Sequence, residues 1–290
     1  MPWALSARIS GRRVTAGQLV GTALVGLAAL GYLLPLFWLT DAAFRSSAEV
    51  FQFPPVLLRD PLNAIRNYRL DNILTAAREW NLGGALQVSL LVTGSSVLLN
   101  LLVSSLCAYA FAFAEFRGKK VLFTVLLAMM MVPMGTMLVP TMRNLRVLHL
   151  NNNVLGLILP YALSPFAVFL LRQYFVKIPR SLMEAAWVDG AGHVRIWWSV
   201  ILPLSGPALV ASGVSQFLFV WNDFLMPSLV LRGDGNRTLP VQLQILLGQV
   251  YNPPLGSMIA FGFVSALVPL AVFLAFQRQF IAGLSGASKG

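Results

Sequence analysis

The sequence predicts an all-α integral membrane protein with six transmembrane helices. Its 290 residues are 57% hydrophobic and only 11% charged, and the mean hydropathy is +0.74, values that exclude an ordinary soluble domain. A helix needs about 20 mostly apolar residues to cross the hydrocarbon layer, and six charge-free runs reach that length. The runs cover residues 14–40, 80–114, 121–142, 147–171, 196–222 and 238–277. The helices expected from these runs cover about 18–39, 84–113, 121–142, 154–175, 204–231 and 256–277, and two of them extend past their run.

An even number of spans places both termini on one side of the membrane, and the basic residues indicate which side. If the termini are inside, that side carries twelve Lys and Arg against three acids, a net charge of +9. The opposite side carries nine Arg against seven acids, a net charge of +2. Because cytoplasmic loops are enriched in Lys and Arg, both termini are predicted to be cytoplasmic. The overall charge of +11 therefore reflects topology, and no nucleic-acid partner is expected.

The runs also divide the chain into segments. The first run follows Arg12 and Arg13 but has 27 uncharged residues, too many for a signal peptide, so we expect a retained helix. The lone Cys107 lies in an apolar run, which leaves no disulfide framework or metal cluster to form. The predicted segments are a cytoplasmic N-terminal segment (1–17), a first transmembrane helix (18–40), an extracytoplasmic loop (41–83), a core of five spans (84–280) and a cytoplasmic tail (281–290).

The third span is unusually rich in Met, Pro and Gly between Met129 and Pro140. Proline removes a backbone donor and methionine is soft and adaptable, so this span is expected to bend. Two interpretations remain open: a kinked helix packed by methionines, or a flexible lining of a translocation path.

The polar segment 178–198 between the fourth and fifth spans reads as two short helices joined at glycines. Pro179 suits a first helical position, and Gly190 can adopt the left-handed conformation that closes a helix. Helical spacing places Leu182, Ala185, Ala186 and Asp189 on one side. The residue pattern fits either an amphipathic loop on the bilayer surface or a docking surface for a partner. A DNA-reading helix pair is disfavoured because the membrane holds the segment.

The same segment resembles a known family. Glu184-Ala185-Ala186, then Gly190, Val200 and Leu202-Pro203 follow the EAA signature of ABC importer permeases, with Val200 in place of the usual Ile. The run 184–191 is similar to that of MalG-like carbohydrate permeases. Two residues depart from the family pattern: Trp187 stands where members often carry a charged residue, and Ser181 where an acid is common. Further landmarks are Ala108-Tyr109-Ala110, Phe116-x-Gly118-Lys119, Leu159-Pro160-Tyr161, Trp221-Asn222-Asp223-Phe224 and Thr238-Leu239-Pro240.

The resemblance implies a type I ABC importer permease of the bacterial cytoplasmic (inner) membrane, embedded in lipid. Such a chain works with a second homologous permease, two ATPase subunits and an extracytoplasmic sugar-binding protein. No Gly-x-x-x-x-Gly-Lys-Ser/Thr motif occurs, so ATP and Mg are expected on the partner ATPase. With two His, one Cys and scarcely any acids inside the spans, the chain is expected to be no enzyme and to bind no cofactor or metal. The resemblance assigns ATPase coupling within 178–198 and just beyond it to Glu184, Ala185, Ala186, Asp189, Gly190, Leu202 and Pro203, and tail contacts with the ATPase to Lys289 and Gly290.

Polar residues inside the spans are candidates for the sugar path, because neutral sugars require hydrogen bonds and ring stacking. Asp223 also fits a structural cap or ion pair near the end of its helix, and Asn100 also fits a contact between helices. The alternative cargoes are glycerol phosphate or a polyol; the rival classes are an ion-coupled transporter, a channel and a membrane enzyme. The candidates for the path are Asn100, Ser104, Gln216, Asn222 and Asp223.

Overall fold

The computed structural model describes residues 8–9, 12–13, 16–50, 68–233, 236–249, 251 and 253–288. These residues are almost entirely helical, which confirms the predicted all-α class; two-residue strands β1 (Arg8–Ile9) and β2 (Arg12–Arg13) pair in antiparallel fashion. The chain divides into two compact units. Unit 1 is Met1–Ala76 with Pro254–Phe263, and unit 2 is Ala77–Pro253 with Val264–Gly290.

Unit 1 is organised around the end of its long helix α1. Arg45 donates two hydrogen bonds of 2.7 Å to the carboxylate of Asp41, and both residues are buried. The Tyr68 hydroxyl donates to the same carboxylate at 3.0 Å, and Asn72 Nδ2 donates to the Arg45 carbonyl at 2.6 Å. These bonds tie the segment around 68–72 to the end of α1. The described helices of this unit are α1 (Ala16–Ala43), α2 (Ser47–Val50), the first part of α5 (Asp71–Glu79) and the first part of α17 (Leu255–Ser288).

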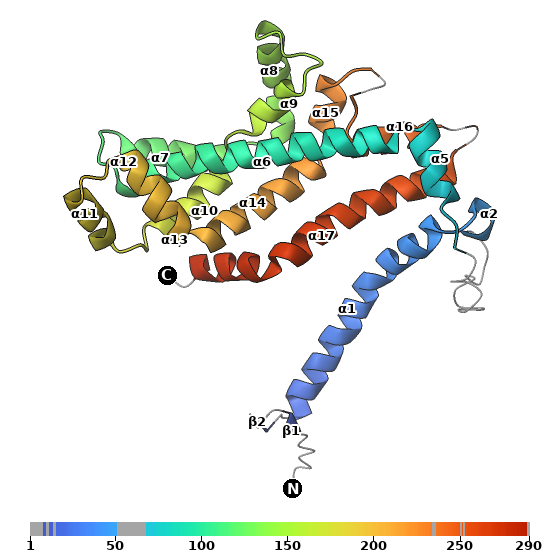
Figure 1. Ribbon diagram of the computed structural model, residues 1–290, viewed down its shortest axis with the longest axis horizontal. Helices are drawn as coiled ribbons and strands as arrows, with labels where there is room; N and C mark the ends of the chain where they lie inside the picture. Colours follow the sequence, from blue (N-terminus) through green and yellow to red (C-terminus); the bar gives the residue numbers. More distant parts are fainter. Residues whose placement is uncertain are drawn as a thin grey trace. The chain divides into compact units, whose positions relative to one another are not determined.

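Unit 2 is built on α6 (Leu82–Phe113), the long helix against which α10 (Pro165–Phe175) and α14 (Gly206–Trp221) pack (Figure 1). Small and polar residues recur every three or four positions on the buried side of α6, which lets other helices approach closely. They are Ser89, Thr93, Ser96, Asn100 and Ser104.

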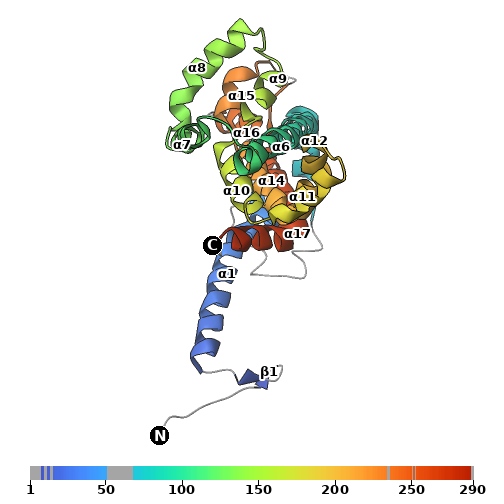
Figure 2. The ribbon, with the colours of Figure 1, turned by 90° about the vertical axis from the view of Figure 1, so that its left-hand side faces the viewer.

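Two apolar clusters lie along α6. Near one end, α8, α9 and α15 gather around Leu157 and Val230. At the other, the end of α6 packs with α7, α10 and the short helices α11 and α12, around Phe175 and Ile196 (Figure 2). The remaining helices are α7 (Lys119–Met129), α8 (Met134–Val147), α9 (Leu155–Ile158), η1 (Leu159–Tyr161), α11 (Arg180–Val188), α12 (His193–Ile196), η2 (Trp197–Ile201), α13 (Leu202–Leu204), α15 (Leu225–Val230), α16 (Leu239–Leu247) and α17 (Leu255–Ser288).

Three described segments are long and apolar enough to cross a membrane alone: Gly17–Ala43, Leu82–Phe113 and Leu255–Phe280. Three helix pairs meet the same criterion only when each bent pair is counted as one span, which gives up to six. The bends are 105° between Lys119–Met129 and Met134–Val147, 43° between Leu155–Tyr161 and Pro165–Phe175, and 85° between His193–Leu204 and Gly206–Trp221.

The bends correct the predicted helix bounds. The break before Met134 confirms the bend expected in the third span, where Pro133 has extended dihedrals. The predicted continuous helix 204–231 is wrong, because α14 ends at Trp221 and α15 begins at Leu225. A continuous helix over 154–175 is also wrong. Ser164 accepts a hydrogen bond from the Ala167 N–H, and Pro165 occupies the first position of a new helix, so a fresh N-terminus forms there.

Candidate functional site

The segment predicted as two short helices has that structure. Gly190 has φ +78°, the predicted left-handed conformation. The Gly190 N–H donates to the Trp187 carbonyl and the Ala191 N–H to the Ala186 carbonyl, both at 2.9 Å. This is the Schellman pattern, which satisfies the last carbonyls of α11. Pro179 lies one position earlier than predicted, as the N-cap residue of α11.

One face of this segment is anchored and the other is open. Met183 is 2% exposed and Ile196 is fully buried, both in the apolar cluster at the end of α6. Glu184, Ala185 and Asp189 on the opposite side are exposed, and large apolar side chains accompany them. These are Leu182, Trp187 and Val188, with exposed fractions of 43%, 44% and 89%. The exposed face combines acidic, small and apolar groups.

The segment continues into α14 through an unusual joint. The α12 helix passes into the π-helix η2 and the short α13, which holds half-buried Leu202 and exposed Pro203. The Ser205 hydroxyl donates to the Ile201 carbonyl at 2.7 Å. Of the predicted coupling residues, Leu202 and Pro203 therefore lie at the 85° bend, and the other five lie in or directly after α11.

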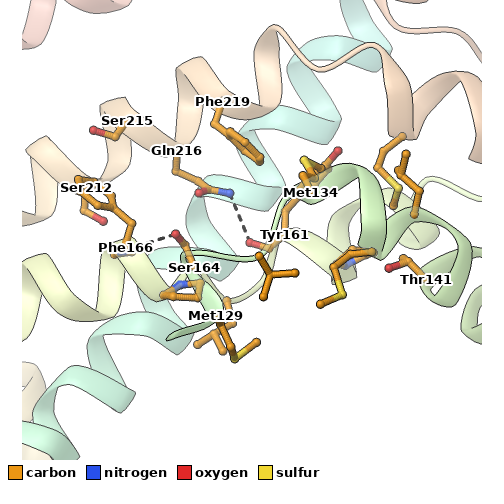
Figure 3. Close-up of a pocket in the computed structure, with 18 residues that line it drawn as sticks. Met129, Met134, Thr141, Tyr161, Ser164, Phe166, Ser212, Ser215, Gln216 and Phe219 are labelled. Atoms are coloured by element: carbon orange, nitrogen blue, oxygen red, sulfur yellow. Dashed lines mark hydrogen bonds between the residues drawn. The ribbon is translucent and has the colours of Figure 1, made fainter. Parts of the chain in front are cut away.

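A separate cavity of about 490 Å³ lies in the middle of unit 2. Its walls come from α7, α8, η1, α10, α14 and α15, and they are mostly apolar with hydroxyl and amide groups among them. Figure 3 shows Gln216 and Phe219 extending from α14 towards Tyr161. The labelled lining residues are Met129, Met134, Thr141, Tyr161, Ser164, Phe166, Ser212, Ser215, Gln216 and Phe219.

Predicted path residues meet at Tyr161. Its carbonyl accepts from Asn100 Nδ2 at 3.1 Å and from Gln216 Nε2 at 3.5 Å, and its hydroxyl donates to the Asp223 carboxylate. Of these partners, Gln216 lines the cavity directly, whereas Asn100 is fully buried behind it. Ser104 also lies behind the cavity, where its hydroxyl accepts from the Ser164 N–H at 3.4 Å.

The two path candidates at the end of α14 do not line the cavity. Asp223 accepts from the Leu225 N–H at 2.9 Å, the arrangement of a cap at the start of α15, and from Tyr161. Asn222 is exposed and donates to the Leu218 carbonyl of its own helix at 2.8 Å. The predicted tail contacts at Lys289 and Gly290 lie outside the described residues.

Sequence reasoning missed most of the cavity's polar and aromatic wall. Ser212, Ser215, Gln216 and Phe219 all line the cavity from α14. Ser215, Gln216 and Phe219 follow Ser212 by three, four and seven residues, which places all four on one face of a helix. This spacing could have identified the face from the sequence. Ser212 is 1% exposed, and its hydroxyl has no hydrogen-bond partner among the described residues.

Two features are typical of a membrane transport subunit. One is a mostly apolar cavity between apolar helices, and the other is a pair of short helices with one anchored and one exposed face. Within the described residues, no three His, Cys, Asp or Glu gather as a metal site. The family model described as "Binding-protein-dependent transport system inner membrane component" matches residues 100–284. The chain belongs to this family and is therefore a multi-pass protein of the inner membrane.

Relatives agree with the family. The arabinooligosaccharides transport system permease protein AraQ of Halalkalibacterium halodurans is 35% identical over 92% of this chain and 95% of its own length. The sn-glycerol-3-phosphate transport system permease protein UgpE of Yersinia enterocolitica is 30% identical over 89% of this chain and 92% of its own. These relatives are ABC transporter permeases, which are transport subunits and not enzymes.

The fold matches a chain in the crystal structure of a bacterial ABC transporter involved in the import of the acidic polysaccharide alginate. The TM-score is 0.78 at 23% sequence identity, and the match covers 90% of this chain and 95% of the other. The match confirms the predicted ABC importer permease fold.

Proposed function

We propose that this chain is one of two permease subunits of an ATP-driven importer that takes up neutral carbohydrate from an extracytoplasmic binding protein. The second permease is homologous and completes the translocation path. Two cytoplasmic ATPase subunits hold ATP and Mg. Both termini of this chain are cytoplasmic, in agreement with the charge asymmetry of the sequence.

The observation that carries this proposal is the two-sided structure of the segment 178–198. A docking element must be accessible on one side and rigidly joined to the moving helices on the other. Exposed Glu184, Ala185 and Asp189 meet the first requirement, and buried Met183 and Ile196 meet the second. A loop that merely rested on the bilayer would turn its large apolar groups into lipid and would need no acids beside them. We therefore assign ATPase coupling to this exposed face.

The cavity supports a neutral cargo. Among the described residues, those that line it include no Asp, Glu, Lys, Arg or His. An anionic cargo such as glycerol phosphate requires cations or aligned donors to offset desolvation of its charge. Hydroxyl, amide and aromatic groups such as Ser215, Gln216 and Phe219 instead suit the hydroxyls and apolar faces of a sugar. The 35% identity to an arabinooligosaccharide permease favours the same class of cargo.

The decisive experiment is to purify the complex with its co-purifying subunits, reconstitute it in liposomes and measure ATP hydrolysis. Neutral oligosaccharides and glycerol 3-phosphate are each supplied with the binding protein. We expect a neutral oligosaccharide to stimulate hydrolysis and uptake, and glycerol 3-phosphate to have no effect. Stimulation by glycerol 3-phosphate alone would contradict the proposed cargo, and uptake without ATP would contradict the proposed mechanism.

Coupling is tested in the same system with a charge reversal. Glu184→Lys should lower stimulated hydrolysis and weaken retention of the ATPase, because the exposed carboxylate is offered to a basic partner group. Glu184→Gln is the matched control, since it keeps the size of the side chain and removes the charge without reversing it, and it should have a smaller effect. Wild-type rates and assembly in Glu184→Lys would remove the assigned role of this residue.

A further inference from the structure

A second hollow, unrelated to the candidate sugar path, lies where the end of α6, the first turns of α7 and the last turn of α10 meet. Its volume is about 470 Å³, and it shares no lining residue with the larger cavity. The six lining residues are Phe111, Lys119, Lys120, Phe123, Thr124 and Arg172. Half of them are cationic and none is acidic, so this hollow has a strongly positive wall.

The Arg172 side chain is held in this wall by contacts that leave its two terminal nitrogens unused. Its Nε donates to the Phe111 carbonyl at 3.0 Å, and its guanidinium carbon lies 4.3 Å from the centroid of the Phe123 ring. The hydrogen bond does not use the two terminal nitrogens. A planar guanidinium held in this way is suited to bind phosphate oxygens.

The two lysines differ in their surroundings. Lys119 Nζ donates to the Ala114 carbonyl at 2.7 Å and the Ala112 carbonyl at 3.5 Å, which closes the end of α6. Lys120 is exposed, and the structure shows no hydrogen bond from its side chain. Glu115 lines an adjoining hollow with both lysines. Within the described ranges, no ion pair joins Glu115 or any other acid to Lys119, Lys120 or Arg172, so no carboxylate is bonded to these three cations.

The hollow adjoins a surface suited to lipid. Val121, Leu122 and Val125 on α7 are 67%, 53% and 53% exposed. Exposed apolar residues on a helix of a multi-pass inner-membrane protein face acyl chains. The cations at the start of α7 therefore lie at the level where a lipid headgroup ends and its acyl chains begin. Basic pockets between transmembrane helices are the usual sites for anionic headgroups.

We propose that this hollow, which we call the basic hollow (Phe111, Lys119, Lys120, Phe123, Thr124 and Arg172), binds the phosphate of an anionic phospholipid. The acyl chains of that lipid lie along Val121, Leu122 and Val125. The apolar surface beside the cations favours a lipid over free phosphate, which has no group to place there.

A lipid bound in the basic hollow would also affect how α7 and α10 move relative to each other. The helix α10 ends at Phe175, shortly after Arg172, and the chain continues to the buried Ile178, the first residue of the coupling segment 178–198. A phosphate held between α7 and α10 would fix the spacing of these two helices. The binding proposal itself rests only on the membrane location and the geometry of the hollow, so it stands or falls separately from the carbohydrate assignment.

The test uses the permease purified in detergent with its co-purifying subunits and titrated with phosphatidylglycerol or phosphatidylcholine, with bound lipid counted by native mass spectrometry. Wild type should bind phosphatidylglycerol in preference. Lys120→Gln combined with Arg172→Gln should weaken phosphatidylglycerol binding by roughly tenfold, since each lost cation removes part of the attraction, and should leave phosphatidylcholine unchanged. Arg117→Gln removes one positive charge from an exposed position that does not line the hollow, and it is the matched control for Lys120→Gln alone.

The single variant Lys120→Gln separates loss of binding from misfolding, because Lys120 is exposed and its side chain makes no hydrogen bond to any described residue. It should weaken phosphatidylglycerol binding less than the double variant and leave the thermal unfolding temperature unchanged. Equal phosphatidylglycerol binding in wild type, the double variant and Arg117→Gln would overturn the proposal. So would equal binding of the two lipids by wild type. Displacement of phosphatidylglycerol by millimolar inorganic phosphate, and not by chloride at the same ionic strength, would identify a site for free anions and also overturn it.

Discussion

The hydroxyl of Tyr109 on α6 lies 3.1 Å from Nδ1 of His193, the first residue of α12. Their rings meet edge to face with centroids 6.1 Å apart, and the Trp187 ring contacts His193 from the other short helix at 5.8 Å. Tyr109 is 7% exposed, so the bond joins the coupling segment to the interior of the helix bundle. Through His193, both short helices are linked to the longest helix of unit 2.

Removal of this hydroxyl should weaken coupling. Tyr109→Phe keeps the ring and deletes one hydrogen bond, worth about 0.5–1.5 kcal/mol net. We expect normal insertion and assembly with stimulated ATP hydrolysis and uptake lowered severalfold. Tyr174→Phe is the matched control, because the structure shows no hydrogen bond from that hydroxyl and Tyr174 packs against the same apolar cluster. Equal activity in both variants would show that the Tyr109–His193 bond carries no coupling.

The left-handed turn at Gly190 should not tolerate a branched side chain. A Cβ added at Gly190 would meet nothing within 4 Å, so the cost of Gly190→Val is backbone strain alone, at least about 1–2 kcal/mol. The second short helix should then be reoriented, with loss of stimulated hydrolysis and uptake. Gly192→Val is the control, because Gly192 has φ −75° and equally open surroundings. A deficit of the same size in both would point to surface bulk and away from the turn.

The aromatic wall of the larger cavity should affect the sugar more than the fold. Phe219 lines the cavity and is 50% exposed. Phe219→Ala should raise the sugar concentration for half-maximal uptake severalfold, because a ring contact contributes about 0.5–1.5 kcal/mol beyond its buried area. Phe217→Ala is the comparison, since Phe217 stacks on Trp221 and does not line the cavity. An unchanged half-maximal concentration in Phe219→Ala would remove Phe219 from the path.

The buried ion pair of unit 1 should behave as a unit. Arg45→Met leaves the Asp41 carboxylate buried without its two donor bonds and should destabilise this unit by about 3–5 kcal/mol. Asp41→Leu combined with Arg45→Met removes both charges and should recover most of that loss. Thermal unfolding in detergent measures the stability of both variants. Additive losses in the double variant would show that the two charges do not depend on one another.

Sidedness is tested by labelling single cysteines on a Cys107→Ser background. Ala77 and Ser181 are both exposed, so a cysteine at either position disturbs little. In intact cells an impermeant thiol reagent should label Ala77→Cys and should reach Ser181→Cys only after permeabilisation. The opposite pattern would invert the proposed topology.

Hydropathy predicted where helices exist because a charge-free run of about 20 residues has few other uses. It did not predict where they break, since an apolar run is equally hydrophobic when straight or bent. The bend at Pro133 had a local signal in Pro, Gly and Met, and the 85° bend at Ser205 had one in Pro203 and the pair Gly206-Pro207. These residues mark where a helix can break, but the angle between its two halves depends on packing between helices.

The same limit applied to the site. Asn100, Ser104 and Gln216 were identified because polar groups are costly inside apolar spans, and the structure places all three at or directly behind the cavity. Phe219 and Met226 carry no such signal. A helix that is apolar on every side does not reveal which side meets a cavity and which meets lipid.

The π-helix Trp197–Ile201 has a consequence for register. The Leu202 N–H bonds to the Trp197 carbonyl, five residues back in place of four. This is the geometry of a single residue inserted into an α-helix. One residue of an α-helix corresponds to about 100° of rotation, so the inserted residue sets the azimuth at which α11 and α12 project relative to the bundle. A one-residue deletion here would leave the composition almost unchanged, but it would rotate the exposed acidic face and the buried anchors Met183 and Ile196 together relative to the bundle.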